Sequence, residues 1–183
     1  MLTYIQTKFD FSNYQMKQLK YFLKSSFAEL SKIIILAFIF RKELLLFSFT
    51  ALLLCLLRIY SGGIHCKTYA GCFVTSLLFF EIVLQGLMNI TLSTTLQLFL
   101  LLICIIAGYL VSPVTSRWHM ELTPEVQQRC RLRYITVIFF YLLSIYIVPA
   151  NQYLQAGFWV IILHTLQLML AKIQKKGALA HEG

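Results

Sequence analysis

Charged side chains are scarce in this chain. They account for 13% of its 183 residues, whereas a soluble domain usually contains about a quarter. Acidic residues are the scarcest, with seven Asp and Glu against sixteen Lys and Arg. Hydrophobic residues make up 59% of the chain and are gathered in long runs. These proportions exclude an ordinary soluble domain and predict an integral membrane protein with an all-α, polytopic helical fold.

Three further absences narrow the possibilities. No folded basic module remains outside the apolar runs, so we expect the net charge of +9 to contact anionic membrane lipids rather than nucleic acid. Five cysteines at irregular spacings do not suggest a disulfide framework and indicate free thiols on the reducing side of a membrane. No small-residue cleavage site follows a short apolar core, so we expect no signal peptide.

Six membrane spans are predicted from the apolar runs, because a bilayer is crossed by about 20 residues of helix. They cover residues 27–40, 44–57, 69–88, 95–112, 134–148 and 156–171. The first two are separated at Arg41–Glu43, since a single span would bury three charges at about 2.5–3.5 kcal/mol each. In residues 9–31, apolar side chains recur every three or four positions between lysines, which predicts an amphipathic helix on the bilayer surface.

The whole chain is predicted to be one membrane domain. It consists of an interfacial segment, a transmembrane bundle and a short, polar cytoplasmic tail, over residues 1–31, 32–171 and 172–183. With the N-terminus in the cytoplasm, most Lys and Arg fall on the inner side, and only Arg41 and Lys42 depart from the positive-inside rule. Pro124 is expected to begin a short helix in an inner loop. The sequence leaves homo-oligomerisation open.

One polar stretch, RIYSGGIHCKTYAGC, interrupts the apolar runs at residues 58–72. Gly62 and Gly63 are expected to end the preceding helix, because glycine disfavours a helix interior and admits positive φ. Non-helical backbone near a membrane needs protein or water to satisfy its polar groups. A re-entrant or water-lined pocket at the cytoplasmic surface is therefore predicted here.

His65 and Cys72 are the candidate catalytic pair of this stretch. A cysteine attacks as its thiolate, and a nearby histidine can accept the proton. On one continuous helix the two would stand ~10.5 Å apart along the axis, which is too far for proton transfer. A dyad therefore requires His65 to lie on a loop that folds back over the start of the next helix. Cys66 is a rival nucleophile.

Two plainer interpretations of the stretch remain open. It could be a polar loop beside a buried cysteine. It could also bind zinc through His65, Cys66 and Cys72, although no fourth ligand is well placed and no CxxC is present. We predict neither a metal nor a cofactor.

Other polar side chains in the spans have less to do with this pair. Ser76 lies one turn beyond Cys72 on the same face, where it could shape the site or bond its own helix backbone. Glu81 falls on the opposite face of that helix and is expected to pair within the bundle. His164 is expected to be a packed or hydrogen-bonded histidine rather than a catalyst.

The stretch resembles the signature of the accessory gene regulator protein B family, in which an arginine precedes Gly-Gly-x-His and a cysteine follows the histidine by seven residues. Chain length, six predicted spans, basic cytoplasmic loops and the place of the motif after the first membrane hairpin also match. The resemblance implies a membrane-embedded cysteine endopeptidase of a Gram-positive bacterium. Such enzymes cleave the C-terminal part from a quorum-sensing propeptide and take part in closing a thiolactone or lactone ring.

Residue by residue, the resemblance makes Cys72 the nucleophile and His65 the general base. Arg58, Gly62 and Gly63 match the frame of the motif, the glycines shaping the loop and the arginine holding a substrate carboxylate. The loop after the fourth span departs from the family, because SPVTSRWHMELTPEVQQRCRLRY contains no Lys-Pro pair. This departure concerns propeptide specificity more than chemistry.

Arg129, Arg131 and Arg133 form a basic run in that loop. They are expected to anchor the protein to lipid headgroups or to bind the acidic tail of the propeptide. The competing function is that of a carrier for a small peptide without proteolytic activity. A carrier would line its path with intramembrane charges, and only Glu81 and the Arg41–Glu43 group qualify.

Overall fold

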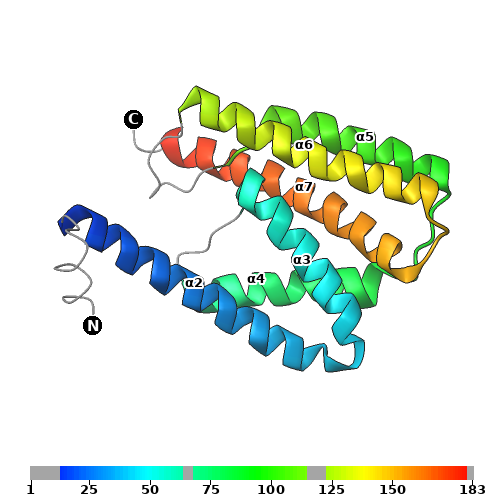
Figure 1. The fold of residues 1–183 in the computed structure, drawn as a ribbon, viewed down its shortest axis with the longest axis horizontal. Coiled ribbons are helices and arrows are strands. Elements are labelled where there is room, and N and C mark those ends of the chain that lie inside the picture. Colours follow the sequence, from blue (N-terminus) through cyan, green and yellow to red (C-terminus); the bar gives the residue numbers. More distant parts are fainter. Residues whose placement is uncertain (1–12, 64–67, 115–122, 181–183) are drawn as a thin grey trace. The chain divides into compact units, whose positions relative to one another are not determined.

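The computed structural model describes residues 13–63, 68–114 and 123–180, with side chains described for Met16 and for most residues between 27 and 174 (Figure 1). The helices are α2 (Asn13–Ile39), the 3-10 turn η1 (Arg41–Glu43), α3 (Leu44–Ser61), α4 (Tyr69–Glu81), the π-helix η2 (Ile82–Leu87), α5 (Thr94–Val111), α6 (Pro124–Ile147) and α7 (Gln152–Ala180). The predicted all-α fold is confirmed.

Five helical segments of the described chain are long and apolar enough to cross a membrane. They are Arg41–Ser61, Tyr69–Leu87, Thr94–Val111, Pro124–Ile147 and Gln152–Gln174. Each contains most or all of one of the last five predicted spans, so the chain is a polytopic membrane helical bundle.

The N-terminal segment is one helix where the sequence suggested two pieces. α2 joins the predicted interfacial segment to the predicted first span without a break and ends at Ile39. The chain then turns through Phe40 and η1 before α3 begins, so the predicted separation at Arg41–Glu43 is correct. Whether α2 itself crosses the membrane stays a prediction. Contacts divide the chain into two compact units, with the boundary after Arg41. The predicted single membrane domain also stays a prediction.

In the second unit, α7 is the central helix. It packs against α3 and α5, and α5 and α3 each pack against α6 (Figure 1). Half of the apolar, membrane-spanning stretch of α7 is buried inside the protein, compared with 22% of the corresponding stretch in α5 and in α6. Among its completely or almost completely buried side chains are Phe158, Val160, Ile161 and Leu168. A helix enclosed in this way can hold polar groups away from lipid, which bears on the site below.

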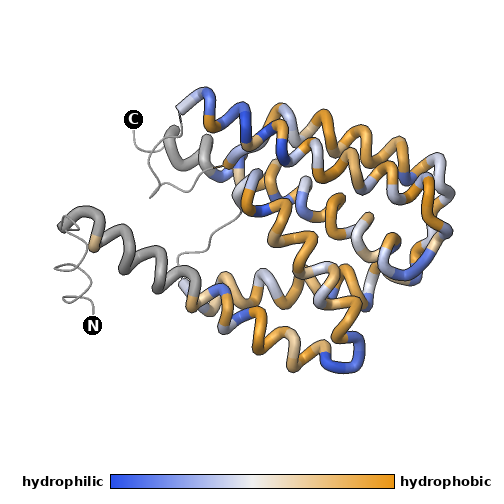
Figure 2. The backbone as a smooth tube through the Cα atoms, viewed as in Figure 1, coloured by the Kyte–Doolittle hydropathy of each residue, from blue (hydrophilic) through white to orange (hydrophobic). Residues whose placement is uncertain are grey.

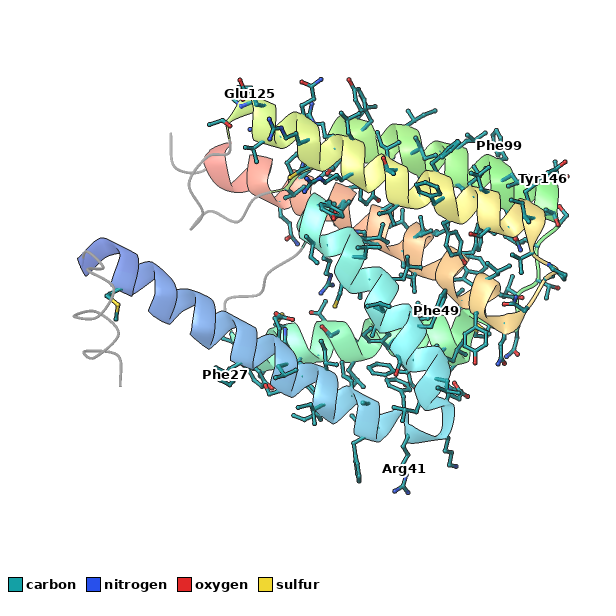
Figure 3. The ribbon with its side chains drawn as sticks, in the orientation of Figure 1. Phe27, Arg41, Phe49, Phe99, Glu125 and Tyr146 are labelled. Atoms are coloured by element: carbon teal, nitrogen blue, oxygen red, sulfur yellow. The ribbon has the colours of Figure 1, made fainter. Side chains whose placement is uncertain are left out.

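The outer surface of this unit is strongly apolar along the helices. Phe99 of α5 and Tyr146 of α6 project away from the bundle, with 59% and 76% of their surface exposed (Figure 3). Hydrophilic residues gather instead at the start of α6, near Glu125 (Figures 2 and 3). An apolar belt with a charged rim at one end is what a lipid bilayer requires of a protein surface.

Tyr134 joins three helices. Its ring lies against Gly108 of α5, where an added Cβ would collide with the ring, and its hydroxyl is 3.1 Å from Thr165 Oγ1 of α7. The side chain is completely buried. A glycine at this position lets α5 and α6 approach closely, as small residues do in membrane bundles.

Two predicted boundaries were wrong. The short loop helix at Pro124 and the span beginning at residue 134 are a single helix, α6, with its proline in the first turn. The polar tail predicted from residue 172 is not separate from the last helix, because α7 continues to Ala180. In both cases Lys, Gln, Arg, Leu and Ala are good helix formers, so a change from apolar to polar residues does not end the helix.

Candidate functional site

The polar motif begins where α3 ends. Gly62 has φ +76° and ψ −153°, a backbone conformation that is essentially restricted to glycine. Its N–H donates to the Arg58 carbonyl at 2.9 Å, and its backbone pairs with Val114 in an isolated parallel bridge. An added Cβ on Gly62 would collide with the Val114 carbonyl oxygen. The helix therefore ends at Ser61, as the two glycines predicted.

His65 and Cys66 lie outside the described residues, as does the rest of 64–67. The structure describes the chain on both sides, up to Gly63 and again from Thr68. The approach of His65 to Cys72 thus stays a prediction.

Cys72 lies in the first turn of α4. Thr68 caps this helix, since its hydroxyl accepts from the Gly71 N–H at 3.1 Å, and its carbonyl accepts from the Cys72 N–H at 3.1 Å. The cysteine is partly exposed, and Ser76, one turn further on the same face, is buried. Cys72 thus stands in the first turn of the helix and is not fully buried.

Arg58 lies beside the glycine loop. An added Cβ on Gly63 would be 3.6 Å from Arg58 Nε, so the guanidinium stem follows the backbone of the loop closely. Its Nη2 donates to Gln167 Oε1 of α7 at 3.3 Å. The arginine is therefore held at the loop, with part of its hydrogen-bonding capacity directed to α7.

Ser61, the last residue of α3, contacts a histidine of the central helix. Its Oγ is 2.7 Å from His164 Nε2 and 2.8 Å from the Leu57 carbonyl oxygen. Both Ser61 and His164 are completely buried. Arg58 and Ser61 thus meet Gln167 and His164 along the contact between α3 and α7.

The three arginines of the basic run differ in their surroundings. Arg131 Nε donates to the Ser112 carbonyl at 2.6 Å, and its guanidinium lies over the Tyr109 ring. Arg133 lies over the ring of Tyr60, three residues before Gly63 in the motif. Arg129 is exposed. Arg131 is committed to the end of α5, whereas the other two remain available at the motif end of the bundle.

The remaining candidates are placed as follows. Glu81 is exposed at the junction of α4 and η2, and its pairing within the bundle stays a prediction. In the part of the chain that the structure covers, no three His, Cys, Asp or Glu side chains gather as a metal site. Because His65 and Cys66 fall outside that part, the zinc interpretation is not tested. No disulfide joins Cys55, Cys72, Cys104 or Cys130.

Sequence reasoning missed three contributors to this end of the bundle: Ser61, Val114 and Gln167. Ser61 stands inside the motif but carries no chemistry of its own that would mark it. Val114 acts through its backbone, which no side-chain pattern reports. Gln167 is an ordinary polar residue in a span, and only its position three residues after His164, on the same helix face, could have drawn notice.

One comparison with known proteins, against a family model, covers nearly the whole chain. A family model described as accessory gene regulator B matches residues 1–168. A curated protein of Clostridium beijerinckii, named as AgrB-like, is 46% identical over 69 residues, which are 37% of this chain and 35% of that protein. The match thus spans about a third of that relative. No solved structure matches the chain.

Proposed function

The chain belongs to the accessory gene regulator B family, and on that premise we propose that it is a membrane cysteine endopeptidase that processes a quorum-sensing propeptide. The observation that carries the proposal is the motif at residues 58–72. It stands where α3 ends and α4 begins, at the end of the bundle that also presents Arg129 and Arg133.

The proposed reaction begins with the Cys72 thiolate, which attacks the carbonyl carbon of the scissile peptide bond. His65 takes the thiol proton and returns it to the leaving amine, so a C–S bond forms and a C–N bond breaks. The N-terminal part of the propeptide is left on Cys72 as a thioester. The partly exposed first turn of α4 supports this role for the cysteine, because a nucleophile must be reached by the peptide.

The thioester has two acceptors. Attack by water releases a free acid. Attack by a thiol or hydroxyl of the bound propeptide closes a thiolactone or lactone ring, breaks the C–S bond and returns the proton to Cys72. Exchange of one thioester for another changes the free energy little, so ring closure requires a bent propeptide and little water.

The tail of the propeptide is assigned to two of the three arginines. Arg129 is exposed, and Arg133 lies over Tyr60 of the motif, so both could bind an acidic segment at the end of α3. Arg131 is excluded from this role because its guanidinium holds the Ser112 carbonyl. Arg58, whose side chain lies along Gly63, would also line the loop. We propose that the end of the bundle that carries the motif, and both termini, lie in the cytoplasm of a Gram-positive cell.

The test is co-expression with a candidate propeptide that has an amphipathic N-terminal helix, a central cysteine or serine and an acidic tail. Cys72→Ser and His65→Ala should each lower release of the C-terminal fragment by about a thousandfold or more, measured by mass spectrometry. Cys130→Ser, on α6, is the matched control and should process normally. A carrier without peptidase activity would instead keep cleavage intact in Cys72→Ser.

A further inference from the structure

Two polar contacts join α7 to the part of the motif that lies in the last turn of α3. Ser61 Oγ lies 2.7 Å from His164 Nε2, and Arg58 Nη2 lies 3.3 Å from Gln167 Oε1. Each pair of residues is three apart on its own helix, so the two contacts lie about one turn apart between α3 and α7, which run in the same direction (Figure 1). Both motif residues are thus held by side chains more than a hundred positions away in sequence.

The available donors and acceptors fix the direction of the hydrogen bond between Ser61 and His164. The Ser61 hydroxyl has one proton, and the carbonyls of Leu57 and Gly62, at 2.8 and 3.3 Å, can only accept it. If His164 Nε2–H donates to Ser61 Oγ, every proton is used and only a lone pair on Nδ1 is left without a partner. The opposite tautomer would bury an unsatisfied N–H, which is the more costly arrangement. We therefore assign His164 as the donor.

Ser61 is also bound through its backbone. Its carbonyl accepts from the Val114 N–H at 2.8 Å, in the bridge that pairs Gly62 with Val114. The chain therefore leaves α3 at a point fixed from two sides, by α7 through a side chain and by the end of α5 through the backbone. Immediately beyond that point begins the segment that carries His65.

We propose that His164 and Gln167 are positioning residues for the motif: they fix where and in which direction the chain departs from α3. The inference rests on the proposed function, in which His65 must return to Cys72. Neither residue touches the reacting atoms, so neither is a catalytic residue.

Packing alone does not explain the pair. A leucine at position 164 would suit the apolar centre of the bundle without leaving a lone pair unsatisfied. Hydrogen bonds between membrane helices contribute only modestly to stability. What the imidazole provides, and a leucine does not, is a directed bond to the last residue of α3. Loss of this bond should therefore disturb the backbone of the motif more than the packing of the helices.

The test uses the full chain in lipid vesicles, with iodoacetamide as the probe of Cys72 after Cys55, Cys66, Cys104 and Cys130 are replaced by serine. His164→Leu should accelerate amide hydrogen exchange in peptides that cover residues 57–63. It should also lower the Cys72 alkylation rate about tenfold, the same effect that we expect from His65→Ala. His164→Gln keeps an N–H donor and should restore both values. Ser61→Ala provides a second route to the same loss, in case the leucine variant does not fold.

Matched controls separate positioning from general loosening. Thr165→Val removes a neighbouring buried hydroxyl of α7, which bonds Tyr134 rather than the motif. Thr50→Val removes one from the middle of α3. Both controls should leave exchange in 57–63 and alkylation of Cys72 unchanged.

Unchanged exchange in His164→Leu and Ser61→Ala, or equal changes in the controls, would overturn the inference. The proposed function fails separately. If His65→Ala leaves alkylation of Cys72 unchanged, the dyad is wrong. The exchange measurement then still decides the anchor, because faster exchange confined to residues 57–63 supports it and unchanged exchange contradicts it.

Discussion

The two halves of the motif are held in different ways. Arg58 and Ser61 are bound by side chains of the central helix, and Gly62 is bridged to Val114. Cys72, by contrast, stands in a helix whose start is stabilised by its own cap, Thr68. The Arg58–Gly62 part of the motif is thus anchored to the bundle, whereas the start of α4 is organised locally.

α4 receives its support from the opposite end. Its continuation, η2, packs against α7, and Gln155 Nε2 donates to the carbonyls of Met88 and Ile90 at 2.8 and 2.9 Å. The first turn, with Cys72, therefore lies at the end of α4 that is farthest from this attachment. We therefore expect the geometry of the proposed site to depend chiefly on where the chain leaves α3, and three predictions test this expectation.

Breaking the anchored half should have the largest effect. Gly62→Ala places a Cβ in a glycine-only conformation, at a cost of about 1–3 kcal/mol, and against the Val114 carbonyl. Propeptide processing should fall about a hundredfold or more, because small displacements of reacting groups are costly. Gly63→Ala is the control, since its Cβ would make an ordinary 3.6 Å contact with Arg58. Equal losses in the two variants would contradict the account.

Substitutions in the basic run should separate structure from substrate binding. Arg131→Gln removes the charged donor to the Ser112 carbonyl and should destabilise the protein by about 1.5 kcal/mol, seen as a lower Tm in detergent. Arg129→Gln should leave Tm unchanged and raise KM for the propeptide, more at low salt than at high salt. A normal KM in Arg129→Gln would remove that residue from the proposed tail site.

The locally organised half should give the smallest effect. Thr68→Ala removes the cap of α4 and should cost about 1 kcal/mol of stability. Processing should fall only a fewfold, because the remaining turns of α4 still carry Cys72. Ser93→Ala is the matched control, since Ser93 precedes α5 without a side-chain cap bond. A loss in Thr68→Ala as large as that in Gly62→Ala would mean that the two halves are held alike.

Much of this arrangement was predictable from local sequence. The separation at Arg41–Glu43 followed from the cost of burying charge, and the end of α3 followed from two adjacent glycines. The length of α6 was not predictable in the same way, because good helix formers in its polar first half continue into an apolar second half that lipid requires to be helical. Hydropathy marks where a chain enters lipid, which need not be where a helix begins or ends.

The contacts that anchor the motif were beyond sequence reasoning. His164 could be recognised as a buried polar residue, but its partner lies 103 positions away and is an ordinary serine. The bridge to Val114 involves backbone groups alone. Arg131 looked like its two neighbours in the basic run, and only the fold distinguishes it, through the carbonyl of Ser112. Such pairings depend on how helices meet, which local patterns do not encode.

The most direct test is capture of the acyl-enzyme. Membranes that contain the protein and a candidate propeptide would be quenched in acid during turnover and analysed by peptide mass spectrometry. We predict a thioester between the N-terminal part of the propeptide and Cys72, cleaved by hydroxylamine and missing in Cys72→Ser. An adduct on Cys66 instead, or continued cleavage by Cys72→Ser, would contradict the assignment of Cys72 as the nucleophile.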